Sequence, residues 1–346
     1  MSVRRAARYA QVSTSVRAMK SRMLGKNGYD RLLRSSSASE CLSILREEEY
    51  FETTTGTGEA LDPASWQRLL DLKMINLIHK LSRLSPDGCA QLLAEFENLY
   101  RLESLKLGLR LIVSPEAKEA TPEITLPAEG EESLRGIVET RNLERLVQSA
   151  GAHALSSEIS SALGENKPLP LIEAIIDKYI LARIWKTADT LDWIDRQSVR
   201  SLIGEHIDAT NLLVVARSKA LGIPSEGVEQ ATVPVNYRLG DALSEAKSSG
   251  SATGALRAFM KTAYANPVGE FLDTHKEGNS LHQLDVLLRR EHASSCLAAF
   301  SGFPFQAGLP VAFVYLIGYE ASDLRGMISG KQDALSVERI QQLLIL

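Results

Sequence analysis

A short acidic segment that occurs twice in the same register constrains the fold of this chain more than any other feature. Residues 208–212 read Asp-Ala-Thr-Asn-Leu, and residues 320–324 read Glu-Ala-Ser-Asp-Leu. The displacement from Asp208 to Glu320 also aligns Ile176 with Leu288, so the register extends well upstream of the acids. Such a repeat implies that one structural unit is used more than once.

A weaker first copy of this signature precedes the other two. Residues 103–107 read Glu-Ser-Leu-Lys-Leu, at a similar spacing before Asp208. Loops that contain Pro and Gly follow the first two copies, and recurring breakers of this kind mark unit boundaries. The chain therefore divides into a first repeat (1–114), an acidic linker (115–133), a second repeat (134–223), a linker with Pro and Gly (224–244) and a third repeat (245–346).

The hydrophobic pattern predicts that almost all of the chain is helical. Leu69, Leu72, Ile75 and Ile78 keep the spacing that lines one face of a helix. Runs with the period of a strand are scarce, and the best of them, residues 231–237, lies close to prolines that favour a loop. We expect an all-α protein in which three repeats pack side by side and bury their apolar stripes against one another.

Composition excludes several classes of function. The 346 residues are 44% hydrophobic and 24% charged, which is typical of a chain that buries a sizeable core. A net charge of -4 gives no general attraction to nucleic acid. The three cysteines, Cys41, Cys89 and Cys296, are widely spaced without a CxxC pair, which predicts neither a disulfide framework nor a zinc site and fits a reducing compartment.

The sequence also predicts that the chain does not cross a membrane. Its longest apolar stretch, Leu309 to Tyr319, is about half of the ~20 residues that a spanning helix needs. No signal-peptide pattern precedes Tyr29. We interpret Leu309–Tyr319, together with Gly302-Phe-Pro-Phe305, as core packing of the third repeat.

The N-terminal segment is strongly basic. Positions 1–35 carry nine Lys or Arg and a single acid, Asp30. Scattered cations of this kind are typical of a solvated helix face. Should they bind a partner, we expect its surface to be acidic.

The sequence contains no pattern for catalysis or for a metal. The histidines His79, His153, His206, His275, His282 and His292 lack the spacing of zinc ligands on helices. The glycines of Thr55-Gly-Thr-Gly58 are not followed by the Lys-Ser or Lys-Thr of a phosphate-binding loop, which predicts a flexible loop. The signature acids lie on separate repeats, so we expect them to make hydrogen bonds within or between repeats, with Arg217 or Arg325 as partners.

Together these residues resemble the C/d subunits of V-type and A-type ATPases. The likeness covers nearly the whole chain: Tyr9, residues 16–24 and 29–33 at the start, residues 208–219 in the middle, and Pro304-Phe305, Tyr315, Glu320, Leu324-Arg325 and Gly330-Lys331 at the end. Two positions depart from the family pattern. Asp323 stands where the family more often has Asn, and Ala152 replaces the aromatic residue present as Tyr50 and Tyr264 in the other copies.

The resemblance implies a funnel of helices with pseudo-threefold symmetry. It implies a non-catalytic rotor subunit, without cofactor, nucleic acid or small-molecule substrate, that seats the central stalk (D/F-type subunits) on the membrane c-ring. Such a protein would transmit torque at the cytoplasmic face of the membrane.

The resemblance also suggests which residues take part. Those expected to form the repeat signatures or an interface are Glu103, Lys106, Arg110, Asp208, Asn211, Arg217, Glu320, Asp323 and Arg325. Contacts with the stalk or the ring are expected at Arg17, Lys20 and Arg22 of the basic segment.

Two other classes of function remain open at this point. A helical-repeat scaffold for unrelated proteins shares the repeats but predicts an elongated solenoid with a concave binding face. An enzyme needs a pocket in which acids with shifted pKa values converge, and no spacing in the sequence points to one.

Overall fold

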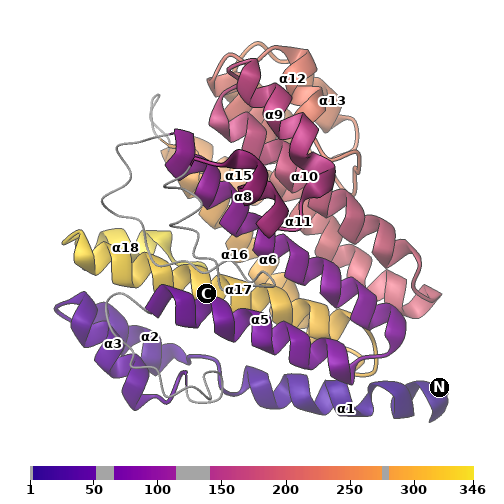
Figure 1. Ribbon diagram of the computed structural model, residues 1–346, viewed down its shortest axis with the longest axis vertical. Helices are drawn as coiled ribbons and strands as arrows, with labels where there is room; N and C mark the ends of the chain where they lie inside the picture. The colour runs from indigo at the N-terminus through magenta and orange to yellow at the C-terminus, as the bar shows by residue number, and fades with distance from the viewer. Residues whose placement is uncertain (1–2, 52–65, 114–140, 275–279) are drawn as a thin grey trace. The chain divides into compact units, whose positions relative to one another are not determined.

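Every regular element of the chain is a helix in the part that the structure describes. The computed structural model describes residues 3–51, 66–113, 141–274 and 280–346 (Figure 1), and within these ranges no strand is formed. This confirms the prediction of an all-α protein. Over the same ranges, we find no helix that has both the length and the apolar character required to cross a lipid bilayer. The acidic linker, the Thr55–Gly58 loop and His275 lie outside the described residues.

The helices fall into two units, which are described one at a time. Unit 1 comprises Met1–His153 and Phe300–Leu346, and unit 2 comprises Ala154–Ala299. Unit 1 thus holds the predicted first repeat, the acidic linker, the beginning of the second repeat and the last part of the third. The division of the chain into three repeats stays a prediction.

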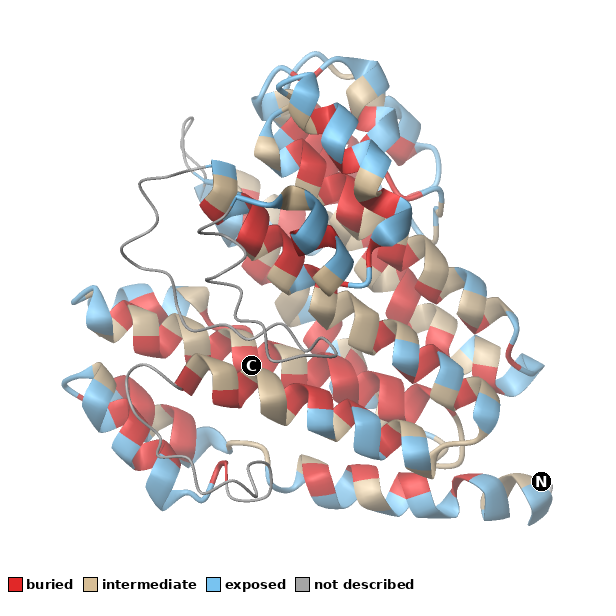
Figure 2. Ribbon diagram, in the orientation of Figure 1, coloured by how far each residue is buried: buried red, intermediate tan, exposed pale blue. Residues whose placement is uncertain are grey.

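Unit 1 is built around one long, buried helix, α17 (Gly308–Gln332), which packs against α1, α3, α5 and α18. Figure 2 shows α17 as buried along most of its length, and Val311, Phe313 and Leu316 are almost fully inaccessible. The other helices of unit 1 are α1 (Val3–Lys20), α2 (Lys26–Arg34), α3 (Ala38–Glu47), α5 (Trp66–Leu84), α6 (Asp87–Val113), α8 (Leu143–Ser149) and α18 (Val337–Leu343). A short 3-10 helix, η2 (His153–Leu155), follows α8.

Unit 2 is arranged in the same way around α11 (Trp193–Ala220), which packs against α10, α12, α14 and α16. Its core gathers Leu212, Val215 and Phe259 with Phe271 and Leu284. The helices around α11 are α9 (Ser156–Gly164), α10 (Leu169–Asp189), α12 (Ser225–Ala231), α13 (Ala242–Ser248), α14 (Ala252–Phe259), α15 (Ala265–Thr274) and α16 (His282–Ala299).

The backbone around the second and third signatures repeats with the same displacement as the sequence. A left-handed residue follows each helix, Gly222 after α11 and Ala334 after α17, and in both cases the next amide donates to a carbonyl near the helix end. The short helices α12 and α18 come next, and their bounds differ by the same displacement that separates Asp208 from Glu320. The two copies of the signature therefore lie in helices that stop in the same way.

A side-chain N-cap begins each of the helices that precede the three positions of the recurring aromatic residue. The helices α3, α8 and α14 begin after Ser37, Asn142 and Ser251, and each of these side chains accepts a hydrogen bond from a backbone amide of the first turn. Such N-caps stabilise a helix by about 1 kcal/mol. The three helices precede Tyr50, Ala152 and Tyr264, which are the positions that the sequence places in register.

Two glycines in the interiors of the long helices offer a test of the packing. A Cβ at Gly204 of α11 would clash with the ring of Tyr237, whereas a Cβ at Gly326 of α17 would meet nothing within 4 Å. We expect Gly204→Ala to lower the free energy of unfolding by about 1–3 kcal/mol. Gly326→Ala should raise it by up to about 1 kcal/mol, because Ala favours the helix over Gly. Chemical denaturation measures both, and equal effects would show that Tyr237 does not pack on α11 as described.

Candidate functional site

The signature acid of the second copy, Asp208, is a fully buried hydrogen-bond acceptor. Its carboxylate accepts from the amides of Tyr237 (3.0 Å) and Arg238 (2.6 Å) and from the hydroxyl of Tyr264 (3.1 Å). The amides belong to the loop after α12, and Tyr264 lies between α14 and α15. Asp208 therefore joins α11 to a loop and to the start of α15.

Asn211, one turn further along α11, holds the same loop. Its side-chain amide donates to the carbonyls of Val233 (3.1 Å) and Val235 (3.0 Å), and its oxygen accepts from the amide of Val233 (2.8 Å). The side chain at this position needs both a donor and an acceptor, because the loop presents two carbonyls and an N–H group to it. The ring of Tyr237, in the same loop, packs against Gly204 of α11.

The third copy repeats this arrangement in unit 1. Glu320 is 2% exposed, and its carboxylate accepts from the amide of Leu24 (2.6 Å) and from the hydroxyl of Tyr50 (2.6 Å). The ammonium of Lys73 lies over the ring of Tyr50, 2.9 Å from its centroid, and donates to the Tyr50 carbonyl (2.8 Å). Glu320 thus connects α17 with residues near the beginning of the chain.

Asp323 takes the place of Asn211 in this copy, and its surroundings explain the difference. It accepts from the amides of Ile345 (2.6 Å) and Leu346 (2.9 Å) and from the hydroxyl of Tyr29 (3.1 Å). All three neighbours are donors, so a carboxylate satisfies them and an amide would not. Val233 and Ile345, the residues held in the two copies, are themselves in register.

Among the described residues, the contacts of the first copy differ from those of the other two. Glu103 is exposed and pairs with Lys106 of its own helix at 2.6 Å, and Lys106 is buried at the position where the other copies have Asn211 and Asp323. Arg110 is exposed on α6. Ala152 stands in the second repeat where the other repeats have Tyr50 and Tyr264, and it has no hydroxyl that could donate to a signature acid.

The two arginines expected to pair with the signature acids have other partners. Arg217 lies 3.6 Å from Asp285 of α16, and Arg325 pairs with Asp71 of α5. Backbone amides and tyrosine hydroxyls donate to the signature acids instead. Of these donors, only Tyr50 and Tyr264 were indicated by the sequence, as an aromatic residue that recurs between copies.

The three N-terminal cations lie at the end of α1 and just after it. A guanidinium nitrogen of Arg17 donates to the carbonyl of Phe300 (3.0 Å), and the ammonium of Lys20 lies 5.1 Å from the centre of the Phe300 ring. Arg22 is exposed. The cations are therefore separate from the signature networks of the same unit.

Burial shifts the pKa values of the groups in these networks. It raises the pKa of Glu320 and lowers the pKa of Lys73 to about 8. The pKa of Asp323 rises to about 6, chiefly through burial and against the three hydrogen bonds that favour its charged form. Burial and the charge of Asp208 raise the pKa of Tyr264, which keeps its hydroxyl protonated as a donor.

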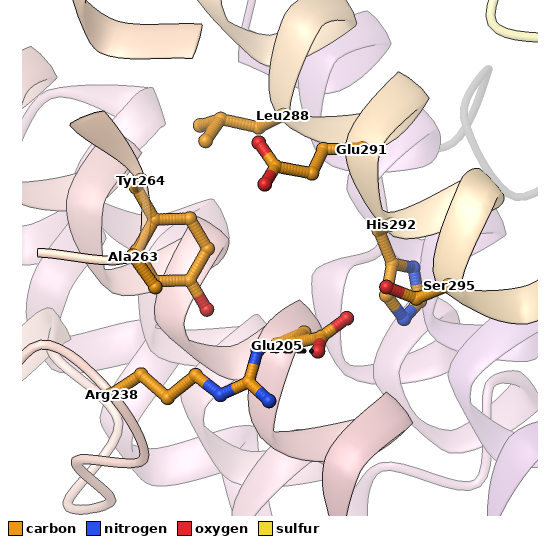
Figure 3. A pocket seen from close by; sticks show the side chains of 8 residues that line it. All are labelled: Glu205, Arg238, Ala263, Tyr264, Leu288, Glu291, His292 and Ser295. Atoms are coloured by element: carbon orange, nitrogen blue, oxygen red, sulfur yellow. Dashed lines mark hydrogen bonds and ion pairs between the residues drawn. The ribbon is translucent and has the colours of Figure 1, made fainter. Parts of the chain in front are cut away.

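A small cavity in unit 2 is lined in part by Arg238 and Tyr264, which both donate hydrogen bonds to Asp208 (Figure 3). It measures about 50 Å³, and Glu205, Arg238, Tyr264, Glu291 and His292 are among the residues that line it. Glu205 pairs with Arg238 at 2.9 Å, which neutralises one of the two carboxylates. This volume holds a few water molecules, whereas pockets for small-molecule ligands typically measure about 300–1,000 Å³.

A larger depression of about 760 Å³ opens widely to solvent at the end of α5. Its lining contains no carboxylate; the lining residues are Asn76, His79, Lys80, Ser82, Arg83 and Leu84. Among the described residues, no three His, Cys, Asp or Glu side chains gather in a way that could hold a metal ion.

The geometry defines an all-helical protein in which buried acids join helices to loops and to distant parts of the chain. Comparison with known proteins then identifies its family. The profile of the ATP synthase (C/AC39) subunit family matches residues 12–343, and the chain belongs to that family. It is similar to the C subunit of the A-type ATP synthase of Methanocaldococcus jannaschii, with 24% identity over 97% of this chain and 86% of the relative. The corresponding protein of Pyrococcus horikoshii is 20% identical over 97% of this chain and 90% of its own length.

The hydrogen bond from Tyr264 to Asp208 can be measured by a double-mutant cycle. We expect Asp208→Asn and Tyr264→Phe to show a coupling free energy of about 1–2 kcal/mol, since hydrogen bonds to charged groups are the strong ones. Tyr237→Phe is the matched control, because Tyr237 reaches Asp208 through its backbone amide. Chemical denaturation measures the four free energies, and coupling no larger than that of the control would contradict the assignment.

His292 predicts how the stability of the protein depends on pH. Burial lowers its pKa from 6.5 to about 4, and its ring nitrogen lies 2.9 Å from the carbonyl of Leu202. Between these two pKa values the unfolded chain binds a proton that the folded chain does not, so stability falls as the pH falls. Relative to His292→Gln, the wild type should lose on the order of 2 kcal/mol between pH 7 and pH 5.

Denaturation at the two pH values measures this loss. His282→Gln, a change at an exposed histidine, is the control and should keep the pH dependence of the wild type. If His292→Gln also kept that dependence, another group would be responsible for it.

Proposed function

We propose that this chain is a non-catalytic rotor subunit, which seats the central stalk of a rotary ATPase on the membrane ring and transmits torque between them. Membership of the ATP synthase (C/AC39) subunit family supports the proposal, as do relatives named as C subunits of A-type ATP synthases over nearly the whole length of the chain. Its direct partners would be D/F-type stalk subunits and the c-ring, at the cytoplasmic face of the membrane.

The observation that carries this proposal is the set of bonds between the beginning of the chain and α17. Tyr50 donates to Glu320 and Tyr29 to Asp323, and the ammonium of Lys331 donates to the carbonyl of Leu33 (2.7 Å). A body that carries torque must deform little under load, and a close-packed core with satisfied polar contacts resists deformation.

The pairing of tyrosines and acids also supports the expected funnel with pseudo-threefold symmetry. The acid of the second copy, Asp208, takes its tyrosine from the third copy, and the acid of the third copy, Glu320, takes Tyr50 from the first. These are two of the three links that a closed ring of repeats would have, and Ala152 supplies no hydroxyl for the third. An elongated solenoid would leave the acid of its last repeat without such a partner.

The signature residues would then have structural roles only. The carboxylates of Asp208 and Glu320 are buried and occupied by donors of the chain itself, so a substrate would not reach them. Nucleotide chemistry would take place on other subunits, and this chain would need no cofactor. Arg17, Lys20 and Arg22 lie outside the signatures and are proposed as contacts with the stalk or the ring.

Membranes depleted of this chain test the proposed role. We expect them to hydrolyse ATP without pumping ions, because the ring would be disconnected from the stalk, and added wild-type chain should restore pumping. A chain with Tyr50→Phe and Glu320→Gln should bind but move fewer ions per ATP, since it lacks a bond between α17 and the first repeat. ATP hydrolysis and a fluorescent reporter of the ion gradient measure both quantities.

Gly326→Ala is the control and should restore pumping as well as the wild type, because its added methyl group meets nothing. ATP-driven pumping that persists in the depleted membranes would contradict a coupling role. Capture of the chain with soluble proteins alone, and not with stalk and ring subunits, would favour a helical scaffold instead.

A further inference from the structure

The N-terminal helix of unit 1 presents an unusually basic surface. Positions 1–29 contain seven Lys or Arg and no acid. Helix α1 buries one side, with Tyr9, Val12 and Val16, against the unit, while Arg8 and Arg17 are exposed. The net charge of the whole chain is -4, so this positive charge is local.

A segment with three phenylalanines lies beside the end of this helix. Phe300, Phe303 and Phe305 stand between α16 and α17 in the chain, and the rings of Phe303 and Phe305 meet edge to face, 5.7 Å apart. All three are partly exposed, whereas α17 is buried from its first residue, Gly308. The phenylalanines of Gly302–Phe305 are therefore only partly packed, whereas Leu309–Tyr319 is buried as the core-packing interpretation expects.

Two of the cations contact the first residue of the aromatic segment. Arg17 donates to the carbonyl of Phe300, and Lys20 lies over its ring. We call Arg17, Lys20, Arg22, Phe300, Phe303 and Phe305 the basic–aromatic patch. In the part of the chain that the structure describes, none of its three cations forms an ion pair with a carboxylate, so their charge is available to an external partner.

We propose that the basic–aromatic patch binds the surface of a membrane that contains anionic phospholipid. Cations near such a surface are attracted by the negative headgroups, and partly exposed aromatic rings bury apolar area at the boundary with the acyl chains. A soluble anion or an acidic protein surface would use the cations alone. Phe300, which Arg17 and Lys20 contact, and the partly exposed rings of Phe303 and Phe305 that follow it in the chain favour a lipid.

Flotation of the purified full chain with lipid vesicles tests this proposal and requires no other subunit, so its failure would leave the proposed rotor function untouched. The chain should float with phosphatidylcholine vesicles that contain phosphatidylglycerol and not with pure phosphatidylcholine, and added salt should release it. Changing Arg17, Lys20 and Arg22 to Gln should weaken binding by up to about 100-fold, at roughly fivefold per cation.

The matched control makes the same change of charge in unit 2, at Lys186, Arg196 and Arg257, and should leave binding close to that of the wild type. Phe303→Ser with Phe305→Ser should weaken binding that depends on phosphatidylglycerol, while Trp193→Ser, which removes an aromatic ring exposed elsewhere, should not. Circular dichroism of each variant confirms that it folds.

Three results would overturn the proposal. The wild type could fail to bind vesicles with phosphatidylglycerol, or the patch variants could bind as well as their controls. Binding that is unaffected by the phenylalanine changes and is displaced by soluble polyglutamate would show that the patch recognises charge alone, as it would on an acidic protein.

Discussion

Burial of the signature carboxylates is the constraint on which both units depend. A carboxylate removed from water costs several kcal/mol unless hydrogen bonds compensate for the lost hydration. Glu320 finds its donors at Leu24 and Tyr50, and Asp208 finds them in the loop after α12 and at Tyr264. Neither acid can be buried until other parts of the chain have reached it, so these residues make local packing depend on the tertiary arrangement.

In unit 1 this dependence joins the two ends of the described chain into one body. Helix α17 is the common partner of α1, α3 and α5, and Arg325 and Lys331 add contacts to Asp71 and Leu33 beyond those of the acids. The first helices and α17 thus belong to one compact unit, although all of unit 2 lies between them in the chain. Coupling between segments so distant in sequence is what a part under torque would require.

The helices and the register of the second and third signatures could be predicted from the sequence, because periodicity and repetition are local properties of a chain. The partners of the acids could not. Arginine was the expected donor, yet Asp208 uses backbone amides of a loop, and a backbone amide leaves no trace in residue identity. The partial exposure of Phe303 and Phe305 could not be predicted either, because residue type alone does not tell how far the neighbouring elements cover an apolar side chain.

The departures from the family pattern follow from the same local chemistry. Asn211 faces carbonyls as well as an N–H group and must be an amide, whereas Asp323 faces donors only and is better served by a carboxylate. In the first copy Lys106 neutralises Glu103 within one helix, and Ala152 supplies no hydroxyl. The identities of Asn211 and Asp323 are therefore set by the hydrogen-bonding groups around each side chain.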